Sequence, residues 1–320
     1  MYIASAYKVL HDSWRYLVGT LVIILGVIIF SIPHTVAVLA KTMDGSADMS
    51  RLDDMNYLMT LFESNLNLVF MLIPFAGGLM LLVLVIKFLH KQTFVQLTTT
   101  RKKIDWGRFW FALIFWGIIS VSLIGLDFAV NPEEYVDNFK LQPFLILCVI
   151  AVILVPLQTS FEEFLFRGYL MQGIGVIAKN KWVPLIVTSV TFGMLHIANP
   201  EIEKLGYVLL IYYIGTGLFL GIVTLMDDGL ELVLGFHLAN NLFTALLVTA
   251  DWTAFQTHSI YKDIAEPSSA GIMDIFVPVF VIFPLVLFVF YKKYKWTDWR
   301  GKLLGKVEAP VKDDIETCDA

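Results

Sequence analysis

Long apolar stretches separated by short polar segments dominate the pattern of this chain. A helix that crosses the hydrocarbon core of a bilayer needs about 20 predominantly apolar residues. The pattern therefore predicts an all-α fold, a polytopic bundle of about eight transmembrane helices. The expected helices cover roughly residues 16–38, 65–88, 108–126, 143–178, 182–198, 206–226, 230–250 and 272–291.

The fourth stretch is too long for one simple crossing, and it contains Pro156, which can kink a helix. No internal repeat or low-complexity linker divides the chain. We expect a single transmembrane domain over residues 1–296, with a motif-bearing core at 143–250. A polar cytoplasmic tail is expected to follow over residues 297–320.

The composition agrees with a membrane protein. Hydrophobic residues make up 58% of the chain and charged residues only 16%, with a mean hydropathy of +0.73. A soluble domain carries about 25% charged residues, so this class is excluded. Of the two cysteines, Cys148 lies in an apolar run and Cys318 in the tail, which does not indicate a disulfide framework.

The distribution of basic residues predicts the orientation, because cytoplasmic loops carry an excess of Lys and Arg. With a cytoplasmic N-terminus, the segments on the inside hold 17 of the 23 Lys and Arg residues, and those on the outside hold five. The remaining one, Arg167, lies within a span. We therefore expect an integral membrane protein with both termini in the cytoplasm.

One turn fits this orientation less well. The segment between the sixth and seventh stretches places Asp227, Asp228 and Glu231 on the predicted inside without a basic residue. Acidic residues contribute little to orientation, so the prediction stands. The basic run at 101–103 is most simply a determinant of topology.

Charged side chains inside the fourth stretch indicate a candidate functional site, because such groups are costly in hydrocarbon. They are Glu162, Glu163 and Arg167. Residues four apart share a helix face, so Glu163 and Arg167 can form a structural ion pair. Glu162 points about 100° away from Glu163 and stays free to accept a proton from water.

The fifth stretch contributes Phe192 and His196, which share a helix face. Gly193, between them, allows a close approach of a neighbouring helix. A histidine of this kind is more often a packing residue that is hydrogen-bonded across helices. Next to Glu162, however, His196 can help to orient and deprotonate a water molecule.

The seventh stretch contributes His237 and Asn241, again one helical turn apart. Both side chains can donate hydrogen bonds to one point, as an oxyanion hole requires. The neighbouring Asn240 is the alternative to Asn241 if the helix is locally overwound. Peptide hydrolysis needs an activated water and a stabilised oxyanion, and the three stretches together supply candidates for both.

The motifs Glu-Glu-x-x-x-Arg, Phe-x-x-x-His and His-x-x-x-Asn occur in this order on three apolar stretches. In this the chain resembles the CaaX protease and bacteriocin-processing family. That family includes the type II prenyl-protein endoproteases and bacterial proteins linked to bacteriocin self-immunity. The resemblance covers roughly residues 143–250, about a third of the chain.

The resemblance implies an intramembrane glutamate endopeptidase of a bacterial cell membrane. Its substrate would be a membrane-embedded or lipid-anchored peptide or protein, cut near the cytoplasmic half of the bilayer. No nucleic acid is expected as a partner. In the implied roles, Glu162 and His196 activate water, and His237 and Asn241 form the oxyanion hole. The residues that would support the site are Glu163, Arg167 and Phe192.

No cofactor is expected. Two histidines and a glutamate from three helices are nevertheless a ligand set that zinc accepts, so the sequence alone leaves a metal site open. Two other functions also stay open. A non-catalytic immunity or interaction factor is disfavoured by the intact motifs. A proton-coupled transporter also keeps intramembrane carboxylates, but it is disfavoured by the lack of repeats and of a second charged cluster.

Overall fold

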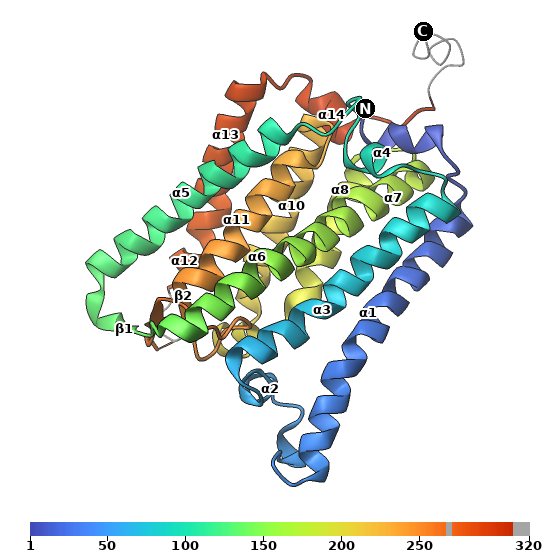
Figure 1. Cartoon of the computed structure of the whole chain (residues 1–320). Helices are drawn as coiled ribbons and strands as arrows, with labels where there is room; N and C mark the ends of the chain where they lie inside the picture. The colour runs from blue at the N-terminus through green and yellow to red at the C-terminus, as the bar shows by residue number, and fades with distance from the viewer. Residues whose placement is uncertain (267–270, 310–320) are drawn as a thin grey trace.

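The computed structural model describes residues 1–266 and 271–309, so residues 310–320 of the expected tail lie outside the described part. The fold is a helical membrane bundle, as the apolar pattern predicts (Figure 1). Six helical segments are long and apolar enough to cross a membrane. These six are Ser13–Met43, Ser64–Leu89, Trp106–Val130, Leu141–Ala178, Tyr207–Asp227 and Ile272–Tyr294.

The expected count of eight crossings is not established by helix length. The predicted fifth and seventh crossings are present as apolar helices, but they are the shorter Trp182–Ala198 and Glu231–Leu247. The second of these has 17 residues. At about 1.5 Å per residue, such a helix falls a few ångströms short of a hydrocarbon core about 30 Å thick.

The six long segments and the two shorter apolar helices contain the main α-helices of the bundle. These are α1 (Ser13–Met43), α3 (Ser64–Leu84), α5 (Trp106–Val130), α6 (Leu141–Glu163), α7 (Met171–Ala178), α8 (Trp182–Met194), α10 (Leu210–Asp227), α11 (Glu231–Leu247), α12 (Ile272–Val277) and α13 (Phe283–Tyr294). Shorter α-helices lie outside them: α2 (Met55–Thr60), α4 (Phe94–Thr98), α9 (Pro200–Leu205) and α14 (Trp299–Leu304).

Turns of 3-10 and π-helix complete the helical structure. The π-helical segments are η3 (Val85–Leu89), η5 (Phe164–Leu170) and η9 (Pro278–Ile282). The 3-10 turns are η1 (Ile3–Lys8), η2 (Met49–Arg51), η4 (Pro132–Glu134), η6 (Leu195–Ala198) and η7 (Tyr207–Leu209). The long fourth segment therefore continues through Pro156, and its irregular part is η5.

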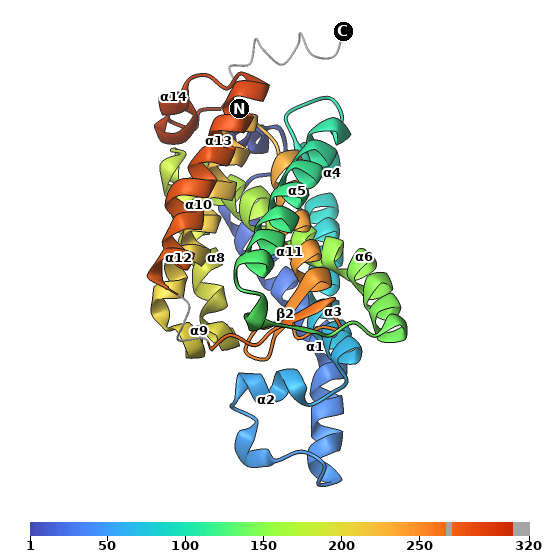
Figure 2. The same cartoon turned by 90° about the vertical axis from the view of Figure 1, so that its left-hand side faces the viewer.

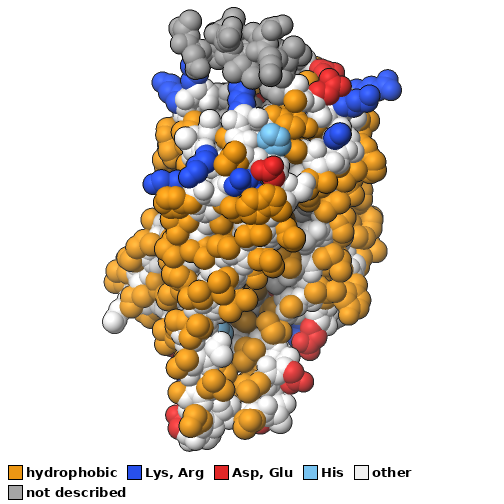
Figure 3. All heavy atoms as spheres, turned by 90° about the vertical axis from the view of Figure 1, so that its right-hand side faces the viewer, with side chains coloured by type: hydrophobic (Ala, Val, Ile, Leu, Met, Phe, Trp, Pro, Cys, Tyr) orange, Lys and Arg blue, Asp and Glu red, His pale blue; other side chains and the backbone are white. Residues whose placement is uncertain are grey.

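One end of the bundle gathers every segment that is expected on the inside. We call it the terminal end, made of residues 1–12, 90–105, 178–182, 227–231 and 295–309. Backbone hydrogen bonds join these segments, for example from Leu10 to His90 at 3.0 Å and from Leu230 to Thr98 at 2.8 Å. Figure 3 shows Lys and Arg side chains at this end and a broad apolar belt below it.

Three short strands lie at the opposite end, which we call the sheet end (Figures 1 and 2). They are β1 (Tyr135–Asp137), β2 (Val248–Ala250) and β3 (Tyr261–Asp263), in the order β1-β3-β2. Val136 and Thr249 both pair with Lys262, in an antiparallel and a parallel ladder respectively. The sheet ties the loop after α5 to the segment after α11.

The acidic turn with Asp227, Asp228 and Glu231 has no basic residue of its own, but it pairs with basic residues from other segments of the terminal end. Arg101 contacts Asp227 at 3.0 Å and Glu231 at 3.2 Å, and Lys302 of α14 pairs with Asp228. The side chains of Asp227 and Glu231 are only 1% and 0% exposed. Arg101 of the basic run thus neutralises buried carboxylates, in addition to the expected role of the run in topology.

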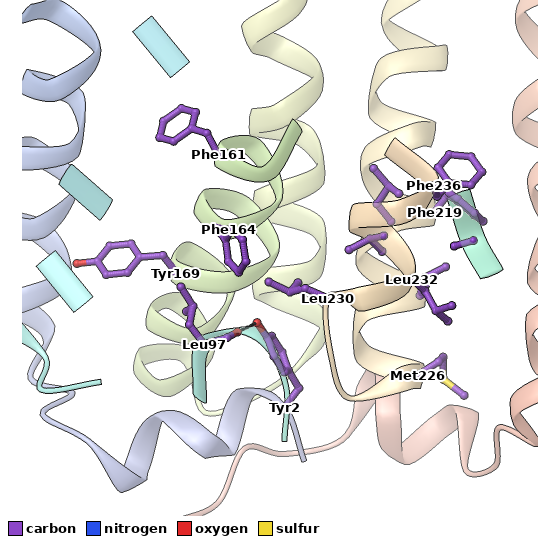
Figure 4. Close-up of a cluster of buried hydrophobic side chains, with 14 of the residues drawn as sticks. Tyr2, Leu97, Phe161, Phe164, Tyr169, Phe219, Met226, Leu230, Leu232 and Phe236 are labelled. Carbon is purple, nitrogen blue, oxygen red and sulfur yellow. Dashed lines mark hydrogen bonds between the residues drawn. The ribbon is translucent and has the colours of Figure 1, made fainter. Parts of the chain in front are cut away.

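The motif helices share a hydrophobic core with the rest of the bundle. Its largest cluster joins Tyr2 and Leu97 at the terminal end to Phe161 on α6, Phe219 on α10 and Phe236 on α11 (Figure 4). In the bundle, α5 packs along α11, α1 along α3, α8 along α10, and α3 along α6. Further contacts of α11 with α6 and with α10 link the three motif helices α6, α8 and α11 to one another.

Helices α8 and α10 approach each other where a side chain would not fit. A Cβ atom on Gly193 would lie 2.8 Å from the backbone nitrogen of Ile214. A Cβ atom on Gly217 would lie 2.7 Å from the carbonyl oxygen of Ser189. The close approach that the sequence predicts at Gly193 is therefore present, and small residues allow it.

Candidate functional site

The charged cluster of the fourth segment lies where α6 changes into the π-helical turn η5. Such turns occur frequently at functional sites. Glu162 is 7% exposed, and Glu163 and Arg167 are fully buried. Nη1 of Arg167 lies 3.0 Å from Oε1 of Glu163, so the ion pair predicted from their spacing is present.

Arg167 has two further partners that fix its guanidinium. It donates a hydrogen bond of 3.2 Å to the carbonyl oxygen of Gly217 on α10. Its Cζ atom also lies 4.3 Å from the ring centroid of Phe192, in a cation–π contact. Phe192 therefore supports the ion pair directly, because a desolvated cation gains from an aromatic face.

His237 lies between the two glutamates. Its Nδ1 is 2.8 Å from Oε1 of Glu163, and its Nε2 is 3.6 Å from Oε2 of Glu162. A carboxylate only accepts hydrogen bonds, so Nδ1 of His237 donates to Glu163. Glu163 thus binds both Arg167 and His237. The helical spacing predicts the contact with Arg167 but not the contact with His237.

His196 lies in η6, just after α8. Its Nδ1 donates to the carbonyl oxygen of Phe192 at 2.8 Å. This contact leaves Nε2 with a lone pair. The ring also stacks on Tyr213, with centroids 4.2 Å apart and an interplanar angle of 21°. The stacking and the hydrogen bond hold the orientation of a potential base.

A chain of amides joins Asn241 to Glu162. Nδ2 of Asn241 donates to Oε1 of Gln158 at 3.2 Å, and Nε2 of Gln158 donates to Oε1 of Glu162 at 2.9 Å. Asn240 instead donates to Oδ1 of Asn241 and accepts from Trp116, each at 3.2 Å. Gln158 was not singled out from the sequence, although it lies one helical turn before Glu162 on an apolar helix.

The four predicted catalytic residues line one small pocket of about 80 Å³. They are Glu162, His196, His237 and Asn241. A water molecule occupies about 30 Å³ in the liquid, so the pocket has room for water beside polar partners. Glu163 and Arg167 are absent from its lining, which separates them from the residues that can meet a reactant.

A larger cavity of about 740 Å³ adjoins this pocket and shares Glu162, His196 and Asn241 with it. Such a volume can accommodate a ligand the size of a short peptide segment. From the motifs, the cavity extends toward the sheet end and reaches Ala250 and Asp263. Among the described residues, no group of three or more His, Cys, Asp or Glu side chains is placed to hold a metal ion.

Comparison with known proteins agrees with the motifs. Residues 141–243 match the family described as type II CAAX prenyl endopeptidase Rce1-like, and this range contains every motif residue. The chain is also 30% identical over 240 residues to the uncharacterized protein YyaK of Bacillus subtilis (strain 168). That similarity covers 75% of this chain and 79% of YyaK. No solved structure matches the chain.

Proposed function

The chain belongs to the CaaX protease and bacteriocin-processing family, and on this basis we propose that it is an intramembrane endopeptidase with Glu162 as its general base. The observation that supports the proposal most is the convergence of Glu162, His196, His237 and Asn241 on one pocket with room for water. Its substrate would be a peptide or protein associated with the membrane.

In the proposed reaction, a water molecule binds between Glu162 and Nε2 of His196. Glu162 takes one proton from it, and the water oxygen attacks the carbonyl carbon of the peptide bond. The proton held by Glu162 then passes to the leaving nitrogen, and the carbon–nitrogen bond breaks. The products are a new amine and a new carboxylic acid, and no cofactor takes part.

The tetrahedral intermediate would be stabilised by Asn241 and His237. The amide of Asn241 has two N–H groups, so one can donate to the oxyanion while the other stays on Gln158. With Nδ1 of His237 bound by Glu163, Nε2 can donate only when the ring is doubly protonated. Glu163 would thus orient His237, and Arg167 would compensate the charge of Glu163.

The test is quantitative profiling of peptide termini in membranes from cells that express the wild-type protein or Glu162→Gln at matched levels. The proposal predicts new termini with the wild type that are missing with Glu162→Gln. Glu203→Gln is the matched control, because Glu203 is exposed and lies outside the cavity lining. Identical termini in all three samples would favour a non-catalytic membrane factor.

A further inference from the structure

The cavity that leads to the motifs is built from the sheet end of the molecule. Its lining includes Tyr135 of β1, Ala250 of β2, Thr253 of the loop after β2, and Asp263 of β3. Within the described residues, no part of the terminal end contributes to this lining. The lining thus extends from Glu162 toward the sheet end, which the distribution of Lys and Arg predicts to be outside.

The wall of this cavity is acidic away from the motifs. Three carboxylates line it there, Asp127 on α5, Glu201 on α9 and Asp263 on β3, and the described lining contains no Lys or Arg. The nearest basic residue in the sheet, Lys262, alternates with Asp263 along β3 and pairs with Asp251 at 2.7 Å. The negative charge of the wall therefore has no basic partner within the cavity.

Glu201 has an unused acceptor. Its Oε1 accepts a hydrogen bond of 2.8 Å from the backbone of Ala254, whereas Oε2 is buried without a hydrogen-bond partner. Burial raises the pKa of Glu201, and it also raises the pKa of Asp263. Both shifts have the sign expected of carboxyl groups that lack a nearby cation. A bound cation would supply this missing charge.

Trp252 adds a group that suits a peptide. Trp252 lines the same cavity, and its indole Nε1 is buried without a hydrogen-bond partner. An indole N–H donates only, so it can bind a backbone carbonyl of a ligand. Tyr135 and Trp252 also present aromatic surfaces, which attract Lys and Arg side chains. The lining therefore combines acceptors for a cation with a donor for a polypeptide backbone.

We propose that the cavity binds a cationic polypeptide segment that enters from the sheet end, and this rests on the proposed endopeptidase function. Its Lys or Arg side chains would lie beside Asp127, Glu201 and Asp263, and its backbone would lie beside Glu162.

Access is tested with single cysteines in a background that carries Cys148→Ser and Cys318→Ser. A membrane-impermeant maleimide is applied to intact cells that express Thr253→Cys, Thr244→Cys or Thr100→Cys. We expect labelling of the two cavity positions, Thr253 and Thr244, and labelling of Thr100 only after the cells are broken. The opposite pattern would overturn entry from the sheet end. Two cavity positions are used so that one misfolded variant does not decide the outcome.

Charge selection is tested by protecting the Thr253→Cys thiol in purified protein. A short alanine peptide that contains lysines should slow alkylation at least about fivefold, and a matched peptide with glutamates should not. Glu201→Gln combined with Asp263→Asn should remove this protection, and Glu203→Gln should keep it. Equal protection by both peptides, or protection that survives the double substitution, would contradict the proposal.

This measurement does not depend on cleavage, so it can be repeated with Glu162→Gln. Suppose that the lysine peptide still protects the thiol in the Glu162→Gln background, and that termini do not differ between wild type and Glu162→Gln. This result would overturn the proposed endopeptidase function and leave a cavity that binds cationic peptides. New termini without charge-selective protection would support the endopeptidase and overturn the binding of a cationic segment. The two proposals therefore fail separately.

Discussion

Nδ1 of His237 lies 2.8 Å from the same carboxylate oxygen of Glu163 that pairs with Arg167 at 3.0 Å. One buried carboxylate on α6 thus joins Arg167 of η5 to the histidine of α11. Glu163 lines neither the small pocket nor the larger cavity. It is therefore a positioning residue in our account, and Glu162 is the residue that contacts the reactants.

Glu163→Gln should lower both stability and turnover. The substitution leaves Arg167 buried without its counter-charge, which costs about 3–5 kcal/mol of unfolding free energy. Loss of the partner that orients His237 should reduce kcat by about 10–100-fold. Thermal unfolding in detergent and cleavage rates measure the two effects. Glu63→Gln is the control, because Glu63 also pairs with a histidine, His258, but is exposed. Equal melting and rates for both variants would refute the shared role of Glu163.

Gln158→Leu should lower kcat by roughly tenfold and leave KM nearly unchanged. The side chain holds Glu162 and Asn241 in place through two hydrogen bonds, and leucine can make neither. Steady-state cleavage separates the two constants. The matched control is Gln172→Leu, which removes a buried hydrogen bond to Gln92 far from the cavity. It should lower the melting temperature without changing kcat. A similar kcat for the two variants would mean that Gln158 is only structural.

Arg101→Ala should destabilise the terminal end. It leaves Glu231 without its charged partner, and Asp227 keeps only Arg108, at 3.5 Å, as a charged partner. Breaking a buried pair costs about 3 kcal/mol or more. Lys102→Ala, one position along at an exposed residue, should change stability by less than about 0.5 kcal/mol. Chemical denaturation in mixed micelles compares them, and equal midpoints would count against a structural network.

Glu201 should make stability depend on pH. Burial raises its pKa in the folded protein, although the hydrogen bond from Ala254 opposes this shift. The folded state therefore binds more protons than the unfolded state, and stability falls as pH rises from about 4.5 through the raised pKa. Glu201→Gln should be more stable than wild type at pH 7.5 and equal to it near pH 4. Melting curves of both proteins and of Glu203→Gln measure this. A Glu201→Gln protein that is less stable at pH 7.5 would contradict the sign.

Contacts within one helix could be predicted from the sequence, because the helical period sets them. Glu163 meets Arg167, and Phe192 meets His196 with ring centroids 4.8 Å apart. The contact of His237 with Glu163 joins residues 74 positions apart, and no spacing rule reports it. The spacing of Gln158 and Glu162 is also helical, but the bond from Asn241 on another helix, which gives Gln158 its linking position, cannot be found from spacing.

The ends of the bundle were harder to predict than its spans. Each strand of the sheet has only three residues, too few for a clear alternation of polar and apolar positions. The described part of the expected tail also packs on the bundle, since Val307 is 3% exposed and Lys181 donates to the backbone of Gly301. Such docking depends on tertiary contacts that a hydropathy pattern does not contain.

The most direct measurement is the turnover of purified Glu162→Gln in proteoliposomes, with the substrate that the terminal profiling identifies. We expect kcat to fall at least about 100-fold, because the variant lacks the general base. The variant should still insert and elute as a single species, and Glu203→Gln should match the wild type. A Glu162→Gln protein that keeps kcat within about threefold of the wild-type value would contradict the central role of Glu162.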